Sequence, residues 1–549
     1  MRFIFITGGV VSSLGKGIAS ACVGTLLNAH GYNVVNIKID PYLNCDPGTM
    51  NPLEHGEVFV TEDGAETDLD LGHYERFTNV NANKNCSFSS GQIYRSVIDK
   101  ERNGVYLGKT IQVVPHITNE IKEKIKSAAY PDTDFVIVEV GGTVGDIESM
   151  PFLESIRQMA YDVGKDNVLY IHMALAPYLR ASGEVKTKPV QQSVKEIGNL
   201  GIKPDVILCR AEKALDESAL DKIALFCNVD KQCVFQALDV DNIYKLPLFF
   251  HQQYLDLAIL NKFRMRPNRH HNNLLENWKK LEEKINHSES GKAKEKIRVM
   301  VVGKYIGLTD AYKSIYESLK HAAYNGGVEL NIYPFDAEVI ETFSDVQIDQ
   351  LMKSRSVDGI LVPGGFGSRG IEGKIRAAKY ARENNIPYFG ICLGMQIAVI
   401  EFLRNVAGIT DATSEEFDAD ALNPVIGLME DQKLKAELGG TMRLGGYLCE
   451  IANKDTNAYS AYKSGFITER HRHRYEFNSK YTEQLENNGM IISGINPEAS
   501  LVEIVEVKDH PWYVGCQFHP EFKSRPLQPH PLFMSFIQAI ERQITNGGR

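Results

Sequence analysis

A cysteine flanked by glycines is the most reactive position that the sequence offers. Cys392 lies in the sequence Gly-Ile-Cys-Leu-Gly at 390–394, between an apolar run and a helical pattern over 395–406. Such a G-x-C-x-G arrangement is typical of a nucleophile elbow, where the glycines permit a tight turn from strand to helix. The helix N-terminus favours the thiolate, which is the nucleophilic form of cysteine. A lone cysteine is usually structural, but the flanking glycines favour a nucleophile here.

A base for this thiol is expected near the C-terminus. An apolar strand over 514–518 is expected to end at His519, and Glu521 follows two residues later. Alternation along an extended chain would put both side chains on one side, so that Glu521 orients the imidazole. Together with Cys392 they predict a Cys–His–Glu triad for acyl transfer.

Donors for a developing oxyanion are expected in the glycine-rich segment 363–367 (Pro-Gly-Gly-Phe-Gly), which follows another apolar strand. Its flexible backbone can aim an N–H at the oxyanion, and the N–H of Leu393 is the second expected donor.

A phosphate-binding loop is predicted at residues 8–17 (Gly-Gly-Val-Val-Ser-Ser-Leu-Gly-Lys-Gly), between a strand and a helix. Small residues let N–H groups face an anion, the helix dipole assists, and Lys16 adds charge at the β- and γ-phosphates. The segment departs from GxxxxGK[ST], because Val10 replaces the first glycine and Gly17 replaces the hydroxyl residue. The pattern favours ATP binding over a glycine-rich turn, and another group must hold Mg²⁺.

Acidic residues supply candidate ligands for that ion. Glu139 lies near the carboxyl end of an apolar strand, the end that lines the ligand crevice in open α/β sheets. Asp70 follows in an acidic segment, whereas Asp68 is interpreted as a solvated surface group. Mg²⁺ prefers one or two carboxylates together with phosphates and water. A further segment with Lys186 and Lys188 is either a polyphosphate site or a solvated basic loop.

Composition limits the possible partners. The chain has 549 residues and a formal net charge of −10, so general nucleic-acid binding is not expected. The run Arg-His-Arg-His-Arg at 470–474 is interpreted as a solvated face or an anion contact. No apolar run is long enough to span a membrane. Nine cysteines without a CxxC pair indicate reduced thiols, so a cytoplasmic location is expected.

The order of elements predicts two doubly wound α/β domains, because apolar strand-like runs alternate with helical patterns in both halves. We predict one such domain over 1–266 and a second over 297–549. The polar segment 267–296 is predicted to be a linker with a short surface helix over 275–285. His270 and His271 could ligate a metal, but a solvated linker is favoured.

Taken together, these motifs resemble the CTP synthase family over nearly the whole chain. The resemblance implies that the domain over 1–266 is an ATP-dependent amidoligase (synthetase) domain of the P-loop NTPase type, and that the domain over 297–549 is a class I glutamine amidotransferase domain. The matching stretches are residues 8–17, 38–42, 55–60, 141–148, 183–189 and 470–475. The resemblance implies that glutamine is hydrolysed through a cysteine thioester and that ammonia passes through an internal tunnel. ATP would phosphorylate O4 of UTP, and ammonia would displace phosphate to give CTP. It further implies Mg²⁺, activation by GTP with a contribution from Arg369, feedback inhibition by CTP, homotetramers and, as in some members, filaments.

The resemblance also assigns residues to each ligand. ATP is expected to contact Ser13, Leu14, Gly15, Lys16, Gly17, Ile18 and Asp70. UTP or CTP is expected to contact Ser12, Asp146, Ile147, Glu148, Lys186, Thr187, Lys188, Gln191 and Lys222. Phosphoryl transfer would use Lys16 and Lys38, and the metal ligands would be Asp70 and Glu139. Glutamine would be held by Gly365, Leu393, Gln396, Glu416 and Arg474.

Two other functions are compatible with parts of the sequence. One is another glutamine-dependent ligase of the cobyric acid type, which has a related phosphate-loop domain but should not bind UTP. The other is a nucleotide-switched assembly protein with an inactive amidotransferase appendage, which the intact Cys–His–Glu set disfavours. The lack of an S-G-G-x-D-S loop argues against an adenylating enzyme resembling GMP synthetase.

Overall fold

The computed structural model describes residues 1–267, 273–291, 293, 295–428 and 442–547. The chain forms two compact units. Unit 1 comprises Met1–Met50 and Thr67–Glu282, and unit 2 comprises Asn51–Glu66 and Glu283–Arg549. His270 and His271 lie outside the described residues. No helix in the described ranges is both long and apolar enough to cross a membrane.

Unit 1 is built on a seven-stranded sheet in the order β11-β10-β7-β1-β6-β2-β5. Every pairing in it is parallel. Its strands are β1 (Arg2–Gly9), β2 (Val34–Asp40), β5 (Ser87–Ser89), β6 (Phe135–Val140), β7 (Val168–Leu175), β10 (Val206–Ala211) and β11 (Val234–Leu238). The central strands are buried along almost their whole length, as expected for parallel strands covered on both faces.

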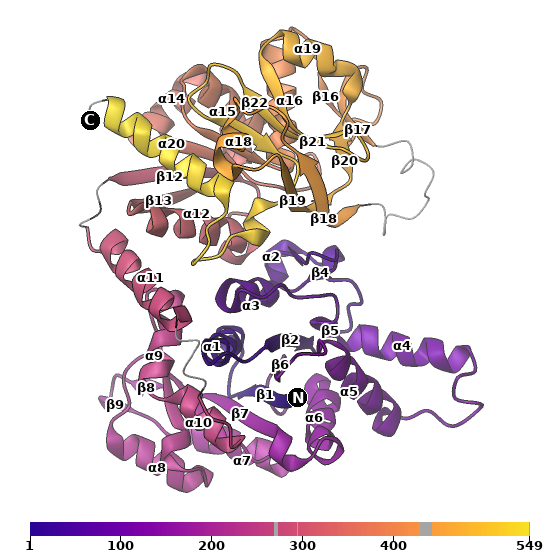
Figure 1. The fold of residues 1–549 in the computed structure, drawn as a ribbon, viewed down its shortest axis with the longest axis vertical. Helices are drawn as coiled ribbons and strands as arrows, with labels where there is room; N and C mark the ends of the chain where they lie inside the picture. Colours follow the sequence, from indigo (N-terminus) through magenta and orange to yellow (C-terminus); the bar gives the residue numbers. More distant parts are fainter. Residues whose placement is uncertain (268–272, 292, 294, 429–441, 548–549) are drawn as a thin grey trace. The chain divides into compact units, whose positions relative to one another are not determined.

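Helices cover both faces of this sheet, with α1 and α3 on one side and α6, α7 and α8 on the other (Figure 1). The helices of unit 1 are α1 (Lys16–Ala29), α3 (Asp70–Thr78), α4 (Ser90–Arg102), α5 (Thr118–Ser127), α6 (Met150–Asp162), α7 (Lys188–Asn199), α8 (Glu217–Cys227), α9 (Leu246–Gln252) and α10 (Leu255–Lys262). A hairpin of β8 (Tyr178–Leu179) and β9 (Glu184–Val185) precedes α7. The doubly wound architecture predicted for this half is therefore confirmed.

Unit 2 contains a nine-stranded sheet in the order β13-β12-β14-β15-β23-β22-β21-β18-β19. The first five strands pair in parallel, and antiparallel strands extend the sheet. They are β12 (Lys296–Gly303), β13 (Glu329–Asp336), β14 (Gly359–Val362), β15 (Tyr388–Ile391), β18 (Arg443–Glu450), β19 (Phe466–His473), β21 (Met490–Asn496), β22 (Leu501–Val507) and β23 (Tyr513–Cys516). Smaller sheets hold β16 (Thr413–Ser414), β17 (Pro424–Leu428) and β20 (Tyr475–Phe477), and the hairpin of β3 (Phe59–Val60) and β4 (Glu66–Thr67).

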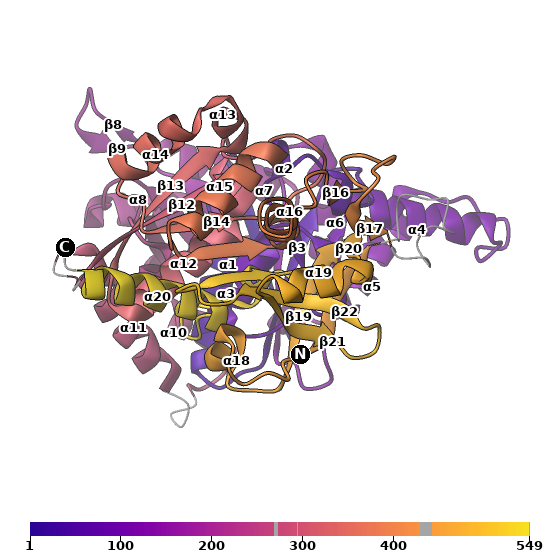
Figure 2. The same cartoon turned by 90° about the horizontal axis from the view of Figure 1, so that it is seen from above.

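Two hydrophobic cores lie on opposite faces of the parallel strands. Met300 and Val302 belong to one core, whereas Val299 and Val301 belong to the other, because successive side chains of a strand point to opposite faces. Figure 2 shows α14 and α15 on one side and α20 on the other. The helices of unit 2 are α2 (Pro52–His55), α12 (Lys313–Gly326), α13 (Ala337–Thr342), α14 (Asp345–Ser354), α15 (Ile371–Glu383), α16 (Leu393–Asn405), α18 (Asn457–Tyr462), α19 (Thr482–Asn487) and α20 (Pro531–Gly547).

The helix predicted in the linker is present as α11 (Asn273–Glu289), and the division between the units falls within it. Most of its residues are exposed, as expected for a surface helix, but Trp278, Leu281 and Ile285 form a buried stripe along one face. In unit 1 the indole of Trp278 packs on the ring of Phe77 at 5.6 Å between ring centroids. An apolar stripe at helical spacing explains this burial despite the charged composition.

Replacing Phe389 should destabilise unit 2. Its ring is fully buried among Trp512, Phe533 and Phe536 at 5.1–5.8 Å between centroids. We expect Phe389→Ala to reduce the free energy of unfolding by about 3–5 kcal/mol, through lost burial and a cavity. Calorimetric unfolding would measure the change. Phe466→Ala is the control, since that side chain is 57% exposed and its loss should change stability by about 0.5 kcal/mol or less.

Candidate active sites

The backbone at Cys392 forms the predicted elbow. Cys392 separates β15 from α16 and has φ 53° and ψ −105°, a left-handed conformation that is strained for a residue with a Cβ. A Cβ at position 390 would collide with the turn at Gly394, and a Cβ at Gly394 would collide with the carbonyl oxygen of Val362. Both glycines are therefore required by close packing, which is the reason for the motif.

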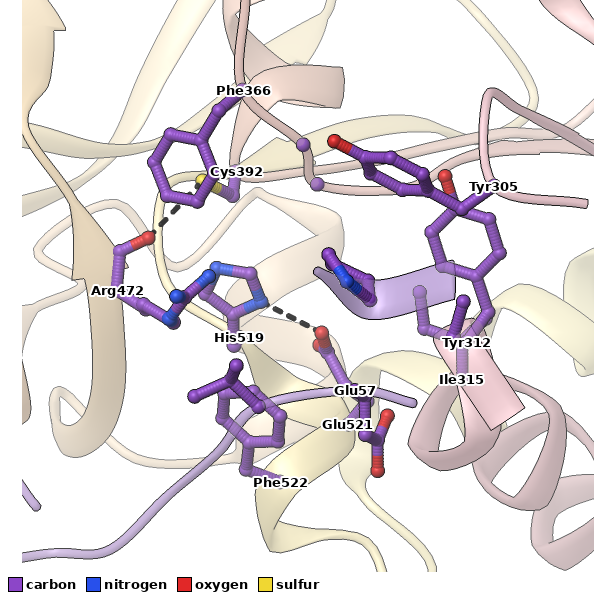
Figure 3. A pocket seen from close by; sticks show the side chains of 15 residues that line it. Glu57, Tyr305, Tyr312, Ile315, Phe366, Cys392, Arg472, His519, Glu521 and Phe522 are labelled. Carbon is purple, nitrogen blue, oxygen red and sulfur yellow. Dashed lines mark hydrogen bonds and ion pairs between the residues drawn. The ribbon is translucent and has the colours of Figure 1, made fainter. Parts of the chain in front are cut away.

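The Cys392 thiol is held in a polar setting, although the residue is only 4% exposed. It donates to the backbone carbonyl of Arg472 at 3.8 Å, and the Gln517 amide donates to the sulfur at 3.8 Å. Figure 3 shows the contact with the Arg472 carbonyl, with the ring of Phe366 and the imidazole of His519 around the same cavity. The cavity measures about 90 Å³, so a small side-chain amide fits it better than a large ligand.

His519 and Glu521 form the second part of the constellation. Nδ1 of His519 lies 2.7 Å from Oε1 of Glu521, and the imidazole stacks on Phe522 at 5.1 Å between centroids. Burial alone would lower the pKa of His519, but the negative charges of Glu521 and Cys392 outweigh it and raise this pKa to about 10. A Cβ at Gly364 would lie 2.9 Å from Cε1 of His519 and 3.5 Å from Cβ of Cys392, so imidazole and thiol meet at this glycine.

One detail of this half differs from the expectation. The strand predicted to end at His519 ends at Cys516 as β23. His519 instead precedes a 3₁₀ turn over Pro520–Lys523, and this turn brings Glu521 back to the imidazole. Strand alternation was therefore the wrong reason for the pairing, although the two side chains do meet.

The glycine-rich loop over 363–367 is held in place by hydrogen bonds to Lys304 and Glu416. The Lys304 ammonium donates to the carbonyls of Phe366 and, at 2.9 Å, of Gly367. The Gly367 N–H donates to Oε1 of Glu416 at 2.6 Å. Sequence reasoning missed Lys304, since a single lysine after a strand has no distinctive spacing. These contacts fix the loop beside Leu393 and Cys392.

The residues predicted to hold glutamine lie around this loop. Burial raises the pKa of Glu416, while its hydrogen bond to Gly367 and the positive charges of Lys304 and Arg474 oppose that shift. Gln396 donates through Nε2 to the carbonyl of Tyr475 at 2.9 Å and to Gln517 at 3.2 Å, and it is 3% exposed. Gln396 is thus engaged with the protein and orients Gln517, which contacts the thiol.

Segment 51–66 contributes to the same cavity, and sequence reasoning assigned it no role there. Pro52, Glu57 and Val58 line the cavity, and Glu57 accepts hydrogen bonds from the backbone N–H of Ser314 at 2.8 Å and from its hydroxyl. Local spacing gives no signal for this, because the partners are separated by 257 residues.

The Arg-His run at 470–474 is an anion contact and not a solvated face. Arg470 is fully buried and forms an ion pair with Glu62 at 2.9 Å, and Arg472 forms one with Glu66 at 2.7 Å. Both carboxylates belong to segment 51–66, so the run attaches this segment to unit 2.

In unit 1 the phosphate loop connects β1 to α1 as predicted. Gly15 has φ 88°, a conformation suited to glycine, and residues 10–13 are exposed. The Lys16 ammonium donates to the carbonyl of Gly142. Burial lowers the pKa of Lys16, although Glu139 and Asp70 oppose the shift. The N–H of Val144 donates to Gly8 at 2.8 Å, so the segment leading to Asp146, Ile147 and Glu148 lies beside the loop.

A lysine surrounded by carboxylates adjoins this loop. The Lys38 ammonium contacts Asp70 and lies 3.2 Å from Glu139, 3.8 Å from Asp40 and 4.0 Å from Asp68. Burial alone would lower the pKa of Lys38, but these carboxylates raise it well above its usual value. The interpretation of Asp68 as a solvated surface group is wrong: its pKa is raised to about 8, chiefly by burial.

The donor set fits Mg²⁺ only together with a nucleotide. Within the described ranges, no group of three or more His, Cys, Asp or Glu side chains is arranged to hold a metal. Asp70 and Glu139 nevertheless converge at the start of α1, where a Cβ at Gly17 would collide with Asp70 and lie 3.3 Å from Oε2 of Glu139. Two carboxylates with phosphate oxygens and water satisfy Mg²⁺.

The basic residues predicted to bind the triphosphate lie beside the β8–β9 hairpin, at the start of α7 and within α8. The Lys186 ammonium contacts Glu184, and the pKa of Glu184 is lowered by that hydrogen bond and by the charges of Lys186 and Lys222. Gln191 donates to the hydroxyl of Thr187 at 3.1 Å, just before α7 begins at Lys188. The structure thus gathers Lys186 and Lys222 near one carboxylate.

Comparison with known proteins agrees with this two-unit arrangement. The family described as CTP synthase N-terminus matches residues 2–265, and the family described as Glutamine amidotransferase class-I matches residues 307–539. A CTP synthase of Hydrogenobaculum sp. (strain Y04AAS1) is 55% identical over 537 residues, covering 98% of this chain and 97% of that protein. A CTP synthase of Oleidesulfovibrio alaskensis is 52% identical and covers 100% of both chains.

Among solved structures, the glutaminase domain of Trypanosoma brucei CTPS with bound acivicin is 41% identical. It covers 45% of this chain and 94% of that chain, with a TM-score of 0.42. Fold and matches define a synthetase domain fused to a class I glutamine amidotransferase domain. The chain belongs to the CTP synthase family, whose members are glutamine-hydrolysing ligases. Neither the cobyric acid-type ligase nor the assembly protein is favoured by these matches.

Replacing Glu521 tests the imidazole's environment. In Glu521→Gln the carboxylate charge is lost, so the pKa of His519 should fall from about 10, and glutamine hydrolysis should fall by about 10²–10⁴-fold. NMR titration of the His519 ring and glutamate release would measure the two effects. Glu483→Gln, at an exposed position of α19, should leave both unchanged. Unaltered hydrolysis with an unmoved titration in Glu521→Gln would contradict a role for the pair.

Proposed function

We propose that this protein catalyses the ATP-dependent amination of UTP at C4 to CTP, with ammonia supplied by glutamine hydrolysis. The observation that carries this proposal is the presence of two separate chemical centres in one chain of this family. Unit 2 has a thiol and a carboxylate-oriented imidazole around a small cavity. Unit 1 has a phosphate loop beside a lysine–carboxylate cluster.

In the glutaminase step, the Cys392 thiolate attacks the carboxamide carbon of glutamine. His519, held by Glu521, gives a proton to the departing ammonia, and water then hydrolyses the thioester to glutamate. The N–H groups of Gly365 and Leu393 would stabilise the oxyanion. Glu416 and Arg474 would bind the amino and carboxylate groups of glutamine, since the forked guanidinium suits a carboxylate. Gln396 would act through Gln517.

In the synthetase step, ATP phosphorylates O4 of UTP because that oxygen is a poor leaving group, and ammonia displaces the phosphate from the 4-phosphoryl intermediate. Ser13, Leu14, Gly15, Gly17 and Ile18 would bind the ATP phosphates through the loop and the start of α1. Lys16 and Lys38 would stabilise charge on the transferring group. When bound by Asp70 and Glu139, Mg²⁺ would neutralise phosphate charge.

The remaining assignments follow from family membership. UTP would bind at Ser12, at Asp146 to Glu148 and at the basic positions Lys186, Lys188 and Lys222, with Thr187 and Gln191. Ammonia would reach it through an internal tunnel, and segment 51–66 is the candidate for its first part, because it lines the cavity of Cys392. GTP activation, CTP inhibition, homotetramers and filaments are proposed by resemblance. A cytoplasmic location is supported by nine free cysteines.

Two variants should separate the two half-reactions. Cys392→Ala should abolish CTP formation from glutamine and leave formation from ammonia within about twofold, because ammonia bypasses the thiol. Lys16→Met should abolish both and leave glutamine hydrolysis measurable. Absorbance-monitored conversion of UTP, with glutamine and then with ammonia, checks both. Loss of both activities in folded Cys392→Ala would refute this division, and no amination of UTP by wild type would refute the function.

Removal of Mg²⁺ should abolish the ATP-dependent amination of UTP and leave glutamine hydrolysis in place. A chelator should stop ammonia-dependent CTP formation, and Asp70→Asn should raise the Mg²⁺ concentration for half-maximal activity by about tenfold or more. Asp99→Asn, at a side chain 60% exposed, is the control and should behave as wild type. An unchanged Mg²⁺ requirement in Asp70→Asn would argue against Asp70 as a ligand.

A further inference from the structure

A fully buried lysine lies behind the glycine-rich loop of the glutaminase cavity. Lys374 is in the first turn of α15 and is 0% exposed. Within the described part of the chain, its Nζ is buried and makes no hydrogen bond. Lysine is almost never fully buried without a partner, because desolvating the ammonium costs several kcal/mol. A buried ammonium without a hydrogen-bond partner therefore destabilises the folded protein, which suggests that it serves a function.

The position of the Lys374 ammonium next to the glycine-rich loop indicates what that function is. A Cβ at Gly365 would lie 3.8 Å from Nζ of Lys374, 3.2 Å from Cε of Lys304 and 3.6 Å from Cδ2 of Leu393. The ammonium therefore lies close to Gly365, and the side chain of Leu393 approaches the same point; the N–H groups of these two residues would face the oxyanion. Lys374 is 0% exposed and is not among the residues that line the cavity, so it can act on charge there without touching glutamine.

Four charged or ionisable groups from different elements face this ammonium. They are Lys304 after β12, Cys392 at the elbow, Glu416 after β16 and Arg369 in the loop before α15. Burial, followed by the repulsion of Lys304, lowers the pKa of Lys374 to about 7, whereas Cys392 and Glu416 act in the opposite direction. Additional negative charge at the thiol or the oxyanion favours the protonated form.

We propose that Lys374 is a positioning residue of the glutaminase half-reaction, whose buried ammonium stabilises the Cys392 thiolate and the oxyanion from behind the Gly364–Gly367 loop. The inference rests on the proposed glutaminase function and deepens it. No bond to Lys374 forms or breaks beyond its own N–H: it binds a proton when the anion is present and releases it when the anion disappears. Its effect is electrostatic and is strengthened by the low local dielectric.

The test compares Lys374→Met, which keeps the length and removes the charge, with Lys379→Met on the same helix, where the side chain is 39% exposed. In Lys374→Met the pH for half-maximal alkylation of Cys392 by iodoacetamide should rise by about one unit. At pH 7 alkylation and kcat for glutamine hydrolysis should fall about tenfold. KM should change little, because Lys374 does not touch the substrate. Lys379→Met should match wild type, and ammonia-dependent synthesis should report intact unit 1.

A second readout concerns stability. The pKa of Lys374 is lower in the folded protein, about 7, than in the unfolded chain, so the unfolded chain binds more protons between these values. The contribution of Lys374 to the free energy of unfolding of wild type therefore becomes more favourable as pH increases from about 7 towards 10.5. Below pH 7 the buried ammonium destabilises the folded protein to its full extent. Lys374→Met should raise Tm, and the gain should be larger at pH 6.5 than at pH 9. A purely structural lysine would instead give a lower Tm at both pH values.

The outcomes are distinguishable. An unmoved alkylation profile with unchanged kcat in Lys374→Met would overturn the role of Lys374 while leaving the glutaminase intact. Absence of glutamine hydrolysis in wild type would overturn the proposed function, and this inference with it. Should Lys374→Met not fold, Lys374→Gln decides by the same alkylation profile, since it is also neutral but retains hydrogen-bonding capacity.

Discussion

The left-handed backbone at Cys392 is the constraint on which the cavity around this thiol depends. A non-glycine residue in this region costs about 1–3 kcal/mol, so the surrounding structure must hold it there. Pairing of β14, β15 and β23 fixes both sides of the turn, and the space left at Gly390 and Gly394 admits no side chain. The thiol is consequently presented between the carbonyl of Arg472 and the amide of Gln517.

Lys38 and Lys374 show how neighbouring charged groups determine the pKa of a buried lysine. Lys38 is surrounded by carboxylates, and its pKa is raised well above its usual value. Lys374 is also buried but has no hydrogen-bond partner among the described residues, and its pKa is lowered to about 7. Burial disfavours the ammonium in both cases, and only the local carboxylates reverse the result. A lysine that stays protonated would suit the proposed phosphoryl transfer at Lys38. A lysine that gains and loses a proton would suit the transient anion proposed beside Lys374.

Segment 51–66 packs with unit 2, although the residues before and after it in the sequence belong to unit 1. It lies within the stretch that matches the CTP synthase N-terminus, yet it packs as part of unit 2. Its carboxylates at Glu62 and Glu66 pair with Arg470 and Arg472. The reason is electrostatic, because a fully buried guanidinium requires an anionic partner. The cavity of Cys392 thus includes residues from both halves of the sequence.

The sequence by itself determined the elements and the chemistry carried by local patterns. Apolar runs predicted the strands now seen as β1, β2, β6 and β12, and the glycine spacing predicted the elbow, because both signals depend on neighbours along the chain. Only tertiary structure decided which face of α11 is buried, the position of the Asp68 carboxylate beside Lys38, and the turn that joins His519 to Glu521. It also placed Lys374 behind Gly365. Those facts depend on contacts between distant segments, which no local spacing encodes.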